Sequence, residues 1–341
     1  MNILFSINHP AHVHFFRNSI KILKKENYNI WVTARDKELT VPLLKHYDID
    51  YILLSKQKRS FINSIKEYFS HQYYLFKILK DKKINLVLSI GGVFSSLSAW
   101  ALGIPSIEFS DTEHAWFQHF LTYPFLTILY TPSCYLSYMG KKQIRYQGYH
   151  ELAYLHPKYY KSDDLIIRKM GINRDEKFVL LRFVSWQASH DLGQGGLSLK
   201  TKRKLIRELS TSARVFISSE EKLDDEFQPY AINIKPWEIH DVIANATLLI
   251  TEGATMASEG AILGTPTIYI NSLKLGYIEE QRCKYKLVYS FRNDDHVSSK
   301  AHELINNNAA KKEWLKKKEN LIRETTDITG LILSSIKKVS S

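Results

Sequence analysis

The stretch LLITEGATMASEGAILGTPTIYI, residues 248–270, decides the fold class of this chain. It opens with a short apolar run, turns at Gly253, continues with helical spacing, and reaches a second apolar run after a Gly-Thr-Pro turn. Short apolar runs bounded by turn residues are typical of strands buried in a parallel sheet. The order strand, helix, strand therefore predicts a βαβ unit.

The same alternation extends along the rest of the chain. Strand-like runs are NILFSI, NIWVTA, DYILL, NLVLSIG, IPSIEF and ILYTPS, and later KFVLLRFV, ARVFISS, INIK, TLLIT, TPTIYI and LVYSF. Amphipathic stretches between them include residues 18–26, 95–102 and 201–209. The rhythm runs twice and breaks near residues 146–164, which are rich in Tyr and His and have no period. This predicts an α/β protein with two Rossmann-like doubly wound domains.

We expect an N-terminal domain over residues 1–155, a second domain over residues 156–320, and a helical tail over residues 321–341. Open α/β sheets bind their ligands beyond the carboxyl ends of the strands. The two domains are therefore expected to face a central cleft, which the loops after the strands would line.

Composition narrows the class of protein. The 341 residues are 44% hydrophobic and 24% charged, as in soluble globular proteins with a large core. Only two cysteines, Cys134 and Cys283, are present, which argues against a disulfide framework and fits a cytoplasmic protein. The net charge of +12 suits phosphate-bearing ligands or an anionic membrane surface, unless the lysines merely solvate helix faces. No nucleic-acid-binding motif is present, so we expect no nucleic-acid partner.

Two segments raise the question of a membrane. Residues 120–140 carry no charge, but Pro124 and Pro132 interrupt them, which favours a helix, a buried strand ILYTPS and a loop over a membrane-spanning helix. Residues 57–83 are basic and aromatic. They predict either docking on an anionic leaflet or an ordinary amphipathic helix packed on a sheet.

Histidines crowd the first predicted strand-to-helix turn. The stretch INHPAHVHFF, residues 7–16, contains His9, His12 and His14. A helix N-terminus favours anions and reacting oxygens, and a neutral histidine such as His12 can accept a proton from a hydroxyl near pH 7. The alternatives are capping or packing roles. A metal site is disfavoured because the three histidines surround one turn and no acidic ligand is near in sequence.

Two further loops follow predicted strands of the first half. In GGVFSSLSAWALGIP, Gly91 and Gly92 let the backbone approach a ligand, and Ser95 can cap the next helix. The loop in SIEFSDTEHAW gathers titratable side chains, namely Glu108, Asp111, Glu113 and His114. A carboxylate such as Asp111 can orient a catalytic histidine. Alternatively, Asp111 or Thr112 is the N-cap of the following helix.

Residues 248–270 and one earlier loop suggest a phosphate site in the second half of the chain. Residues Gly253, Ala254 and Thr255 would direct backbone amides at a phosphate, and Glu259 could accept hydrogen bonds from a ribose diol. The stretch LLRFVSWQASHDLGQGG adds Arg182, Ser185, Ser189 and His190. The guanidinium of Arg182 suits a diphosphate, or else a buried structural ion pair.

The motif GATMASEGAILGTPTIYI resembles the nucleotide-sugar motif of GT-B glycosyltransferases, most closely that of the N-acetylglucosaminyltransferases that form lipid II. This resemblance implies that Glu259 holds the ribose of a uridine-type sugar nucleotide and that Gln281 lies at the sugar. The stretch NHPAHVHFF is similar to that family's first glycine-rich loop, with His12 at its histidine. Other residues stand where that family has glycines, namely Asn8, His9, Pro10 and Ala11. The stretch GGVFSSLSAWALGIP resembles its second loop, which faces an acceptor diphosphate.

As a whole, the sequence resembles a family of bacterial and archaeal proteins of unknown function that occur with surface-polysaccharide genes. Its members begin INHPAHVHFF and carry TARDK, DTEHA and RFVSWxASHD, found here at residues 33–37, 111–115 and 182–191. The non-hydrolysing UDP-GlcNAc 2-epimerases also share the expected fold and a glycine-rich turn followed by an acidic residue.

These resemblances imply a metal-independent, inverting GT-B glycosyltransferase. It would move a sugar from a nucleotide sugar, with UDP types favoured, to a saccharide or lipid-linked acceptor in surface polysaccharide synthesis. No cofactor and no metal are expected. The alternatives are a non-hydrolysing UDP-sugar 2-epimerase, a sugar-nucleotide hydrolase, and a non-enzymatic assembly factor at the membrane surface. The expected location is the cytoplasm, at the inner face of the membrane if the protein docks there.

Roles follow for each candidate residue. His12 is expected to be the general base, and Asp111 to orient it. The donor-binding residues are expected to be Arg182, Ser185, Ser189, His190, Gly253, Ala254, Thr255, Glu259 and Gln281. The acceptor-binding residues are expected to be His9, His14, Gly91, Gly92, Ser95, Glu113 and His114.

Overall fold

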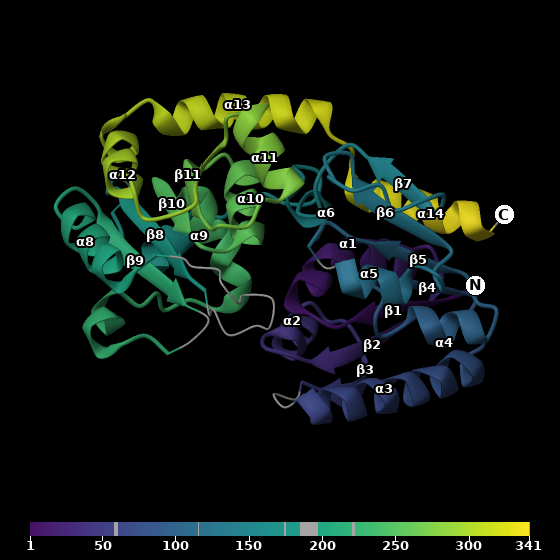
Figure 1. Cartoon of the computed structure of the whole chain (residues 1–341). Helices are drawn as coiled ribbons and strands as arrows, with labels where there is room; N and C mark the ends of the chain where they lie inside the picture. The colour runs from purple at the N-terminus through teal and green to yellow at the C-terminus, as the bar shows by residue number, and fades with distance from the viewer. Residues whose placement is uncertain (58–60, 115, 174, 185–196, 220–221, 341) are drawn as a thin grey trace. The chain divides into compact units, whose positions relative to one another are not determined.

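The computed structural model describes residues 1–341 except 58–60, 115, 174, 185–196, 220–221 and 341. The chain divides into two compact units (Figure 1). The first unit comprises Met1–Tyr159 and Thr325–Ser341, and the second comprises Tyr160–Glu324. Residues 325–341 thus belong to the first unit, whereas the sequence suggested a separate tail.

A seven-stranded parallel sheet forms the first unit, in the order β3-β2-β1-β4-β5-β6-β7. Its strands are β1 (Asn2–Ile7), β2 (Asn29–Asp36), β3 (Ile52–Lys56), β4 (Leu86–Ile90), β5 (Ser106–Phe109), β6 (Ile128–Pro132) and β7 (Gln143–Tyr146). Its helices are α1 (Pro10–Lys25), α2 (Thr40–His46), α3 (Phe61–Asp81), α4 (Ser96–Ala101), α5 (Trp116–Thr122), α6 (Leu152–Leu155) and α14 (Ile328–Ser340). The strand β7 was not among the predicted runs, because QIRY carries only one aliphatic residue.

A five-stranded parallel sheet forms the second unit, in the order β12-β11-β10-β8-β9. Its strands are β8 (Phe178–Phe183), β9 (Arg214–Ser219), β10 (Leu248–Thr251), β11 (Thr267–Ile270) and β12 (Val288–Phe291). Its helices are α7 (Leu165–Lys169), α8 (Leu199–Leu209), α9 (Ile239–Asn245), α10 (Ala254–Leu263), α11 (Gly276–Cys283), α12 (Val297–Asn306) and α13 (Ala310–Glu324), with short 3₁₀ turns at Asp225–Tyr230 and Pro236–Glu238. The prediction of a strand at INIK, residues 232–235, is wrong. Next to this segment the structure has an isolated bridge, between Ile217 and Ala231, and no strand.

Burial explains why these segments become strands and helices. In β1, Ile3, Leu4 and Phe5 are fully buried, as a central strand covered on both faces requires. Phe16 of α1 packs edge-on against Phe5, with ring centroids 5.1 Å apart. The second unit repeats this pattern in β8 and β10, whose apolar residues are buried almost throughout.

The C-terminal helix α14 joins the first unit through an apolar stripe. Its residues Ile328, Ile332 and Ile336 are four positions apart and fully buried, so they need a surface to cover them. That surface is α1 and α6, where Thr329 Oγ1 donates to the carbonyl oxygen of Ala153 at 2.8 Å. This packing is the reason why residues 325–341 do not form a separate tail.

Within the described ranges, no helix is both long and apolar enough to cross a membrane. The uncharged segment at residues 120–140 contains the end of α5, the strand β6 and a loop, which confirms that prediction.

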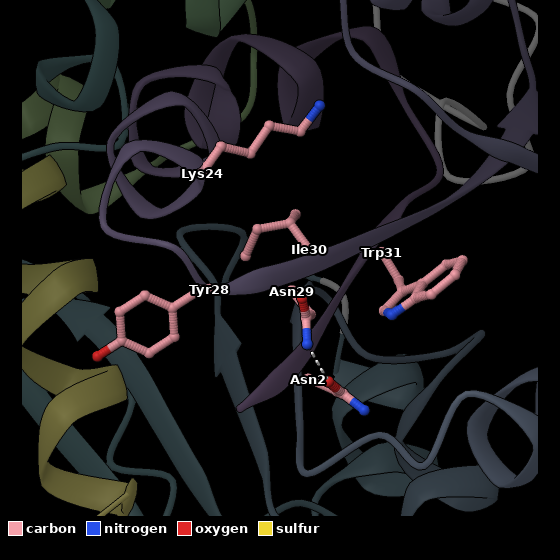
Figure 2. Close-up of a pocket in the computed structure, with 6 residues that line it drawn as sticks. All are labelled: Asn2, Lys24, Tyr28, Asn29, Ile30 and Trp31. Atoms are coloured by element: carbon pink, nitrogen blue, oxygen red, sulfur yellow. Dashed lines mark hydrogen bonds between the residues drawn. The ribbon is translucent and has the colours of Figure 1, made fainter.

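A surface hollow of 450 Å³ opens at the amino-terminal edge of the first sheet (Figure 2). Asn2 and Asn29, which begin β1 and β2, line it and are joined by a hydrogen bond of 2.9 Å. The remaining lining residues are Lys24, Tyr28, Ile30 and Trp31. Ligands of open α/β sheets bind at the opposite, carboxyl-terminal edge, so this hollow is not the predicted site.

Candidate functional site

The loop after β1 holds two of the predicted histidines at the start of α1. His9 is the N-cap, and its Nδ1 accepts the backbone N–H of Ala11 at 3.2 Å. Pro10 follows at the first helical position, where its fixed φ suits the helix. One turn on, Nδ1 of His12 accepts the backbone N–H of Asn8 at 3.3 Å. The ring centroids of His9 and His12 are 5.9 Å apart, so both lie at the carboxyl end of β1.

Asp111, after β5, pairs with a histidine that the sequence did not single out. Its Oδ2 lies 3.2 Å from Nδ1 of His150, which follows β7. The His150 ring is 8% exposed and lies 4.6 Å from the ring of Phe15 between centroids. The helix α5 begins at Trp116, so Asp111 is not its N-cap. The sequence signal that was missed is Gly148-Tyr149-His150, which follows the unrecognised strand β7 after one residue.

Burial lowers the pKa values of these histidines, which favours their neutral forms. Burial, followed by His9, His150 and Lys37, lowers the pKa of His12 well below its usual value. Burial also lowers the pKa of His150, and Asp111 opposes that shift. Because His150 contributes to the pKa of His12, the two rings belong to one electrostatic cluster with Asp111. We call His12, Asp111 and His150 the histidine cluster.

Three buried polar atoms around the histidine cluster have no hydrogen-bond partner among the described residues. They are Asn8 Oδ1, Tyr146 OH and His150 Nε2. The Tyr146 and His150 rings are nearly parallel, and Asn8 bonds to His12, so all three atoms border the cluster. Buried polar groups are normally satisfied by protein, water or ligand. The cluster therefore has unused hydrogen-bonding capacity for polar groups of a ligand.

The Gly91-Gly92 turn after β4 covers a buried carboxyl group. Both glycines have positive φ, of +72° and +59°, and a Cβ on Gly92 would lie 2.0 Å from Glu108 Oε2. Burial raises the pKa of Glu108 to about 8, and its oxygens have no hydrogen-bond partner among the described residues. Ser95 occupies the predicted N-cap position of α4, but its buried hydroxyl makes no capping bond. Instead Ser96 Oγ donates to the carbonyl oxygen of Gly92 at 2.9 Å.

The other predicted acceptor residues lie elsewhere in the first unit or on its loops. His14 is buried, with its ring centroid 5.9 Å from that of Tyr47 and 5.3 Å from that of Tyr154. Two residues along a helix are about 200° apart, so His14 and His12 face different ways. In the loop after β5, Glu113 Oε1 accepts the backbone N–H of Leu136 at 3.4 Å, and His114 is exposed.

In the second unit, the start of α10 is organised around Glu259. Gly253 is the N-cap, Ala254 is the first helical residue, and Thr255 is exposed. Glu259 is only 6% exposed, and its Oε1 lies 3.0 Å from Nε2 of His240 on α9. The sequence did not point to His240, because it lies in an ordinary helical segment well before the motif.

The neighbouring donor candidates have structural partners. Gln281 is fully buried and donates from Nε2 to Ser258 Oγ at 2.7 Å, so in this structure it braces α10. Arg182 Nη1 donates to Ser218 Oγ at 2.8 Å, across the β8–β9 pair. The predicted donor residues Ser185, Ser189 and His190 lie outside the described residues.

One carboxylate in the motif holds the second unit together at this edge. Glu252 is 1% exposed and accepts the backbone N–H groups of Val184 at 2.8 Å and Leu197 at 2.7 Å. It thereby ties the end of β8 to the approach to α8. In the part of the chain that the structure describes, no group of three or more His, Cys, Asp or Glu side chains is arranged to hold a metal ion.

Solved structures with this architecture are known. The UDP-GlcNAc 2-epimerase of Neisseria meningitidis bound to UDP-GlcNAc aligns with a TM-score of 0.72 and 14% identity, over 99% of this chain and 100% of that chain. MurG of Acinetobacter baumannii aligns with a TM-score of 0.61 and 12% identity, over 99% and 100%. Likeness at this identity shows the fold alone, and it confirms the predicted GT-B fold of two Rossmann-like units.

Similarity in sequence identifies the family. The uncharacterized protein MJ0665 of Methanocaldococcus jannaschii is 25% identical over 279 residues, which cover 79% of this chain and 81% of that protein. A family model described as "Protein of unknown function (DUF354)" matches residues 1–336. The chain therefore belongs to the DUF354 family.

Proposed function

We propose that this protein is a glycosyltransferase that takes a sugar from a nucleotide sugar, of UDP type, and transfers it to a saccharide or lipid-linked acceptor. The observation that carries the proposal is the start of α10, where Gly253 is the N-cap, Thr255 is exposed, and the buried Glu259 follows in the same helix. A helix N-terminus attracts phosphate, and a fixed carboxylate can accept hydrogen bonds from the two hydroxyl groups of a ribose. The second unit would thus bind the nucleotide diphosphate.

The first unit would bind the acceptor at the histidine cluster. In the proposed reaction the acceptor hydroxyl oxygen forms a bond to the anomeric carbon of the sugar. The bond from that carbon to the diphosphate oxygen breaks, and its electron pair leaves with the nucleotide. A base must take the hydroxyl proton, and a neutral histidine is suited to this task near pH 7. The arrangement requires no group other than side chains and helix N-termini.

A second candidate is a UDP-sugar 2-epimerase. It is favoured by the higher TM-score to the Neisseria epimerase, 0.72 against 0.61 for MurG. Epimerisation also needs acid–base groups, but it acts on the nucleotide sugar alone. A sugar-nucleotide hydrolase would likewise need no sugar acceptor other than water.

The first experiment is a thermal-shift screen of the full chain with UDP, GDP, CMP and their sugars. We expect UDP compounds to raise the melting temperature, since a ligand that binds only the folded state stabilises it. The stabilising nucleotide sugar is then incubated with the protein and followed by NMR. A changed sugar ring indicates an epimerase, and nucleotide release without an acceptor indicates a hydrolase. Nucleotide release that depends on an added acceptor supports the transferase. If no nucleotide binds, the proposal is refuted and a non-enzymatic assembly factor becomes the better reading.

We further propose that the first unit works at an anionic membrane surface, through the outer face of α3. On this helix the buried face carries Glu67 and His71, whereas the exposed face carries large apolar side chains at helical spacing. These are Ile65, Phe69, Tyr73 and Phe76. Exposed lysines at positions 66, 77 and 80 flank them. The negative charge of Glu67 is paired with Arg35 on the buried face. Aromatic side chains with flanking lysines suit anionic headgroups.

Co-sedimentation with phosphatidylglycerol and phosphatidylcholine vesicles tests this docking. We expect binding to the anionic vesicles that weakens with salt and is lost in the double variant Phe69→Ser with Tyr73→Ser. The matched control is Leu165→Ser with Leu199→Ser, which removes exposed apolar residues from the second unit. Equal loss in both variants contradicts the proposal. Concentration-dependent dimerisation that only the α3 variant abolishes would assign the face to a second copy instead.

A further inference from the structure

Hydrogen-bond partners define which ring nitrogen of His12 carries the proton. In a neutral imidazole one nitrogen donates and the other accepts. Nδ1 of His12 accepts the backbone N–H of Asn8 at 3.3 Å, so it holds the lone pair, and the ring's hydrogen bond to the backbone carbonyl of Ser6 comes from Nε2–H. A proton on Nδ1 would point at the N–H of Asn8. His12 therefore presents an N–H donor at Nε2, which cannot accept a proton from a hydroxyl.

His150 has the opposite arrangement. Its Nδ1 lies 3.2 Å from Asp111 Oδ2, so a proton on Nδ1 is attracted by the carboxylate, whereas a lone pair there would be repelled by it. The proton of neutral His150 therefore lies on Nδ1, and Nε2 holds the lone pair. That nitrogen is buried and has no hydrogen-bond partner among the described residues. A carboxylate that fixes the tautomer of a histidine and leaves Nε2 free is the arrangement of a general base.

We propose that the Asp111–His150 pair is the proton acceptor of this site and that His12 is its neutral N–H donor. This inference rests on the proposed glycosyl transfer. The hydroxyl proton of the acceptor passes to Nε2 of His150 while the hydroxyl oxygen bonds to the anomeric carbon and the nucleotide diphosphate leaves with the electron pair. The imidazolium formed is stabilised by the Asp111 carboxylate.

The position of His150 sets one condition on this role. Its Nε2 lies below the surface, so the acceptor hydroxyl reaches it only when neighbouring side chains move. Phe15 and Tyr146 have their rings beside His150. The hydroxyl of Tyr146 also lacks a partner among the described residues, which supplies a second polar atom for the same acceptor.

The tautomers are tested without any substrate. The full chain is labelled with ¹⁵N-histidine, and long-range ¹H–¹⁵N correlation spectra are recorded near pH 7.5, with His12→Gln and His150→Gln used for assignment. We expect His12 to be protonated at Nε2 and His150 at Nδ1. A proton on Nδ1 of His12, or on Nε2 of His150, overturns the proposal. This readout stands even if no nucleotide sugar proves to be a substrate.

Activity separates the two roles once a donor and an acceptor are known. The side-chain amide of His12→Gln still offers an N–H, so we expect a loss of about tenfold or less in kcat. His150→Gln cannot take up a proton, so we expect a loss of about 10²–10⁴-fold, the usual contribution of a general base. Equal losses, or a larger loss in His12→Gln, refute the division of roles. A thermal shift with UDP confirms in each variant that folding and donor binding remain intact.

Discussion

His240 Nε2 and Glu259 Oε1 are 3.0 Å apart, and both side chains are buried. The histidine belongs to α9 and the glutamate to α10, so the contact fixes the carboxylate against its neighbouring helix. A carboxylate held by a second residue is already oriented before a ligand arrives, which reduces the entropic cost of binding.

Replacing Glu259 by Gln is expected to weaken UDP binding by about 10- to 100-fold. The amide keeps the size of the side chain but removes the charge, and hydrogen bonds to charged groups contribute about 1.5–3 kcal/mol. Isothermal titration calorimetry measures the change. Glu303→Gln on α12 is the control, because that side chain is 60% exposed and pairs with the neighbouring Lys300. Unchanged affinity in Glu259→Gln would remove this residue from the nucleotide site.

Replacing Asp111 by Asn is expected to reduce kcat by about 10³–10⁴-fold with little effect on UDP binding. The amide can donate to Nδ1 of His150 and so favour the wrong tautomer, as in the hydrolase triad. Steady-state kinetics and a UDP thermal shift provide the two readouts. Asp50→Asn serves as the control, since the Asp50 side chain is 97% exposed. A loss of UDP binding in Asp111→Asn would place this carboxylate on the donor side instead.

Gly92→Ala is expected to destabilise the protein more than Gly103→Ala does. Both glycines have positive φ, +59° and +66°, which costs an alanine about 1–2 kcal/mol. Only the Gly92 methyl would overlap the Glu108 carboxyl, whereas nothing lies within 4 Å of a Cβ on Gly103. Overpacking typically costs a further ~1–3 kcal/mol. Urea unfolding in a Glu108→Ala background should abolish the difference, and its persistence would rule out steric overlap as the cause.

Stability is expected to fall as the pH drops below about 6.5, the ordinary pKa of a histidine. Burial is the largest cause that lowers the pKa of His12, His150 and His71, the last to about 4. Below pH 6.5 the unfolded chain therefore binds protons that the folded protein does not, and the free energy of unfolding decreases. Urea unfolding between pH 5 and pH 8 measures the slope.

One buried histidine can be removed to test the origin of that slope. His71→Gln should make the pH dependence shallower, because its group no longer titrates on unfolding. His46→Gln replaces an exposed histidine and serves as the matched control. A slope that is the same in both variants would show that the buried histidines are not responsible.

Local patterns in the sequence were sufficient for the architecture. Runs such as NILFSI and TLLIT are apolar on both faces, which leaves only a position inside a parallel sheet. The strand β7 was missed and INIK was wrongly predicted, because edge pairing depends on the neighbouring strand more than on the residues themselves. The positions of His12 and Asp111 near strand-to-helix turns, and of Glu259 in the helix after such a turn, followed from the same periodicity.

The sequence by itself therefore determined two Rossmann-like units and which turns carry polar residues, since both follow from periodicity over a few neighbouring residues. Only the tertiary structure decided the partners. It brought His150 to Asp111 and His240 to Glu259, placed Gln281 in the interior, and turned an aromatic stripe of α3 to the surface. These contacts join segments that lie far apart in the chain or on different sides of one helix. Their formation depends on strand order and helix packing, which no local spacing encodes.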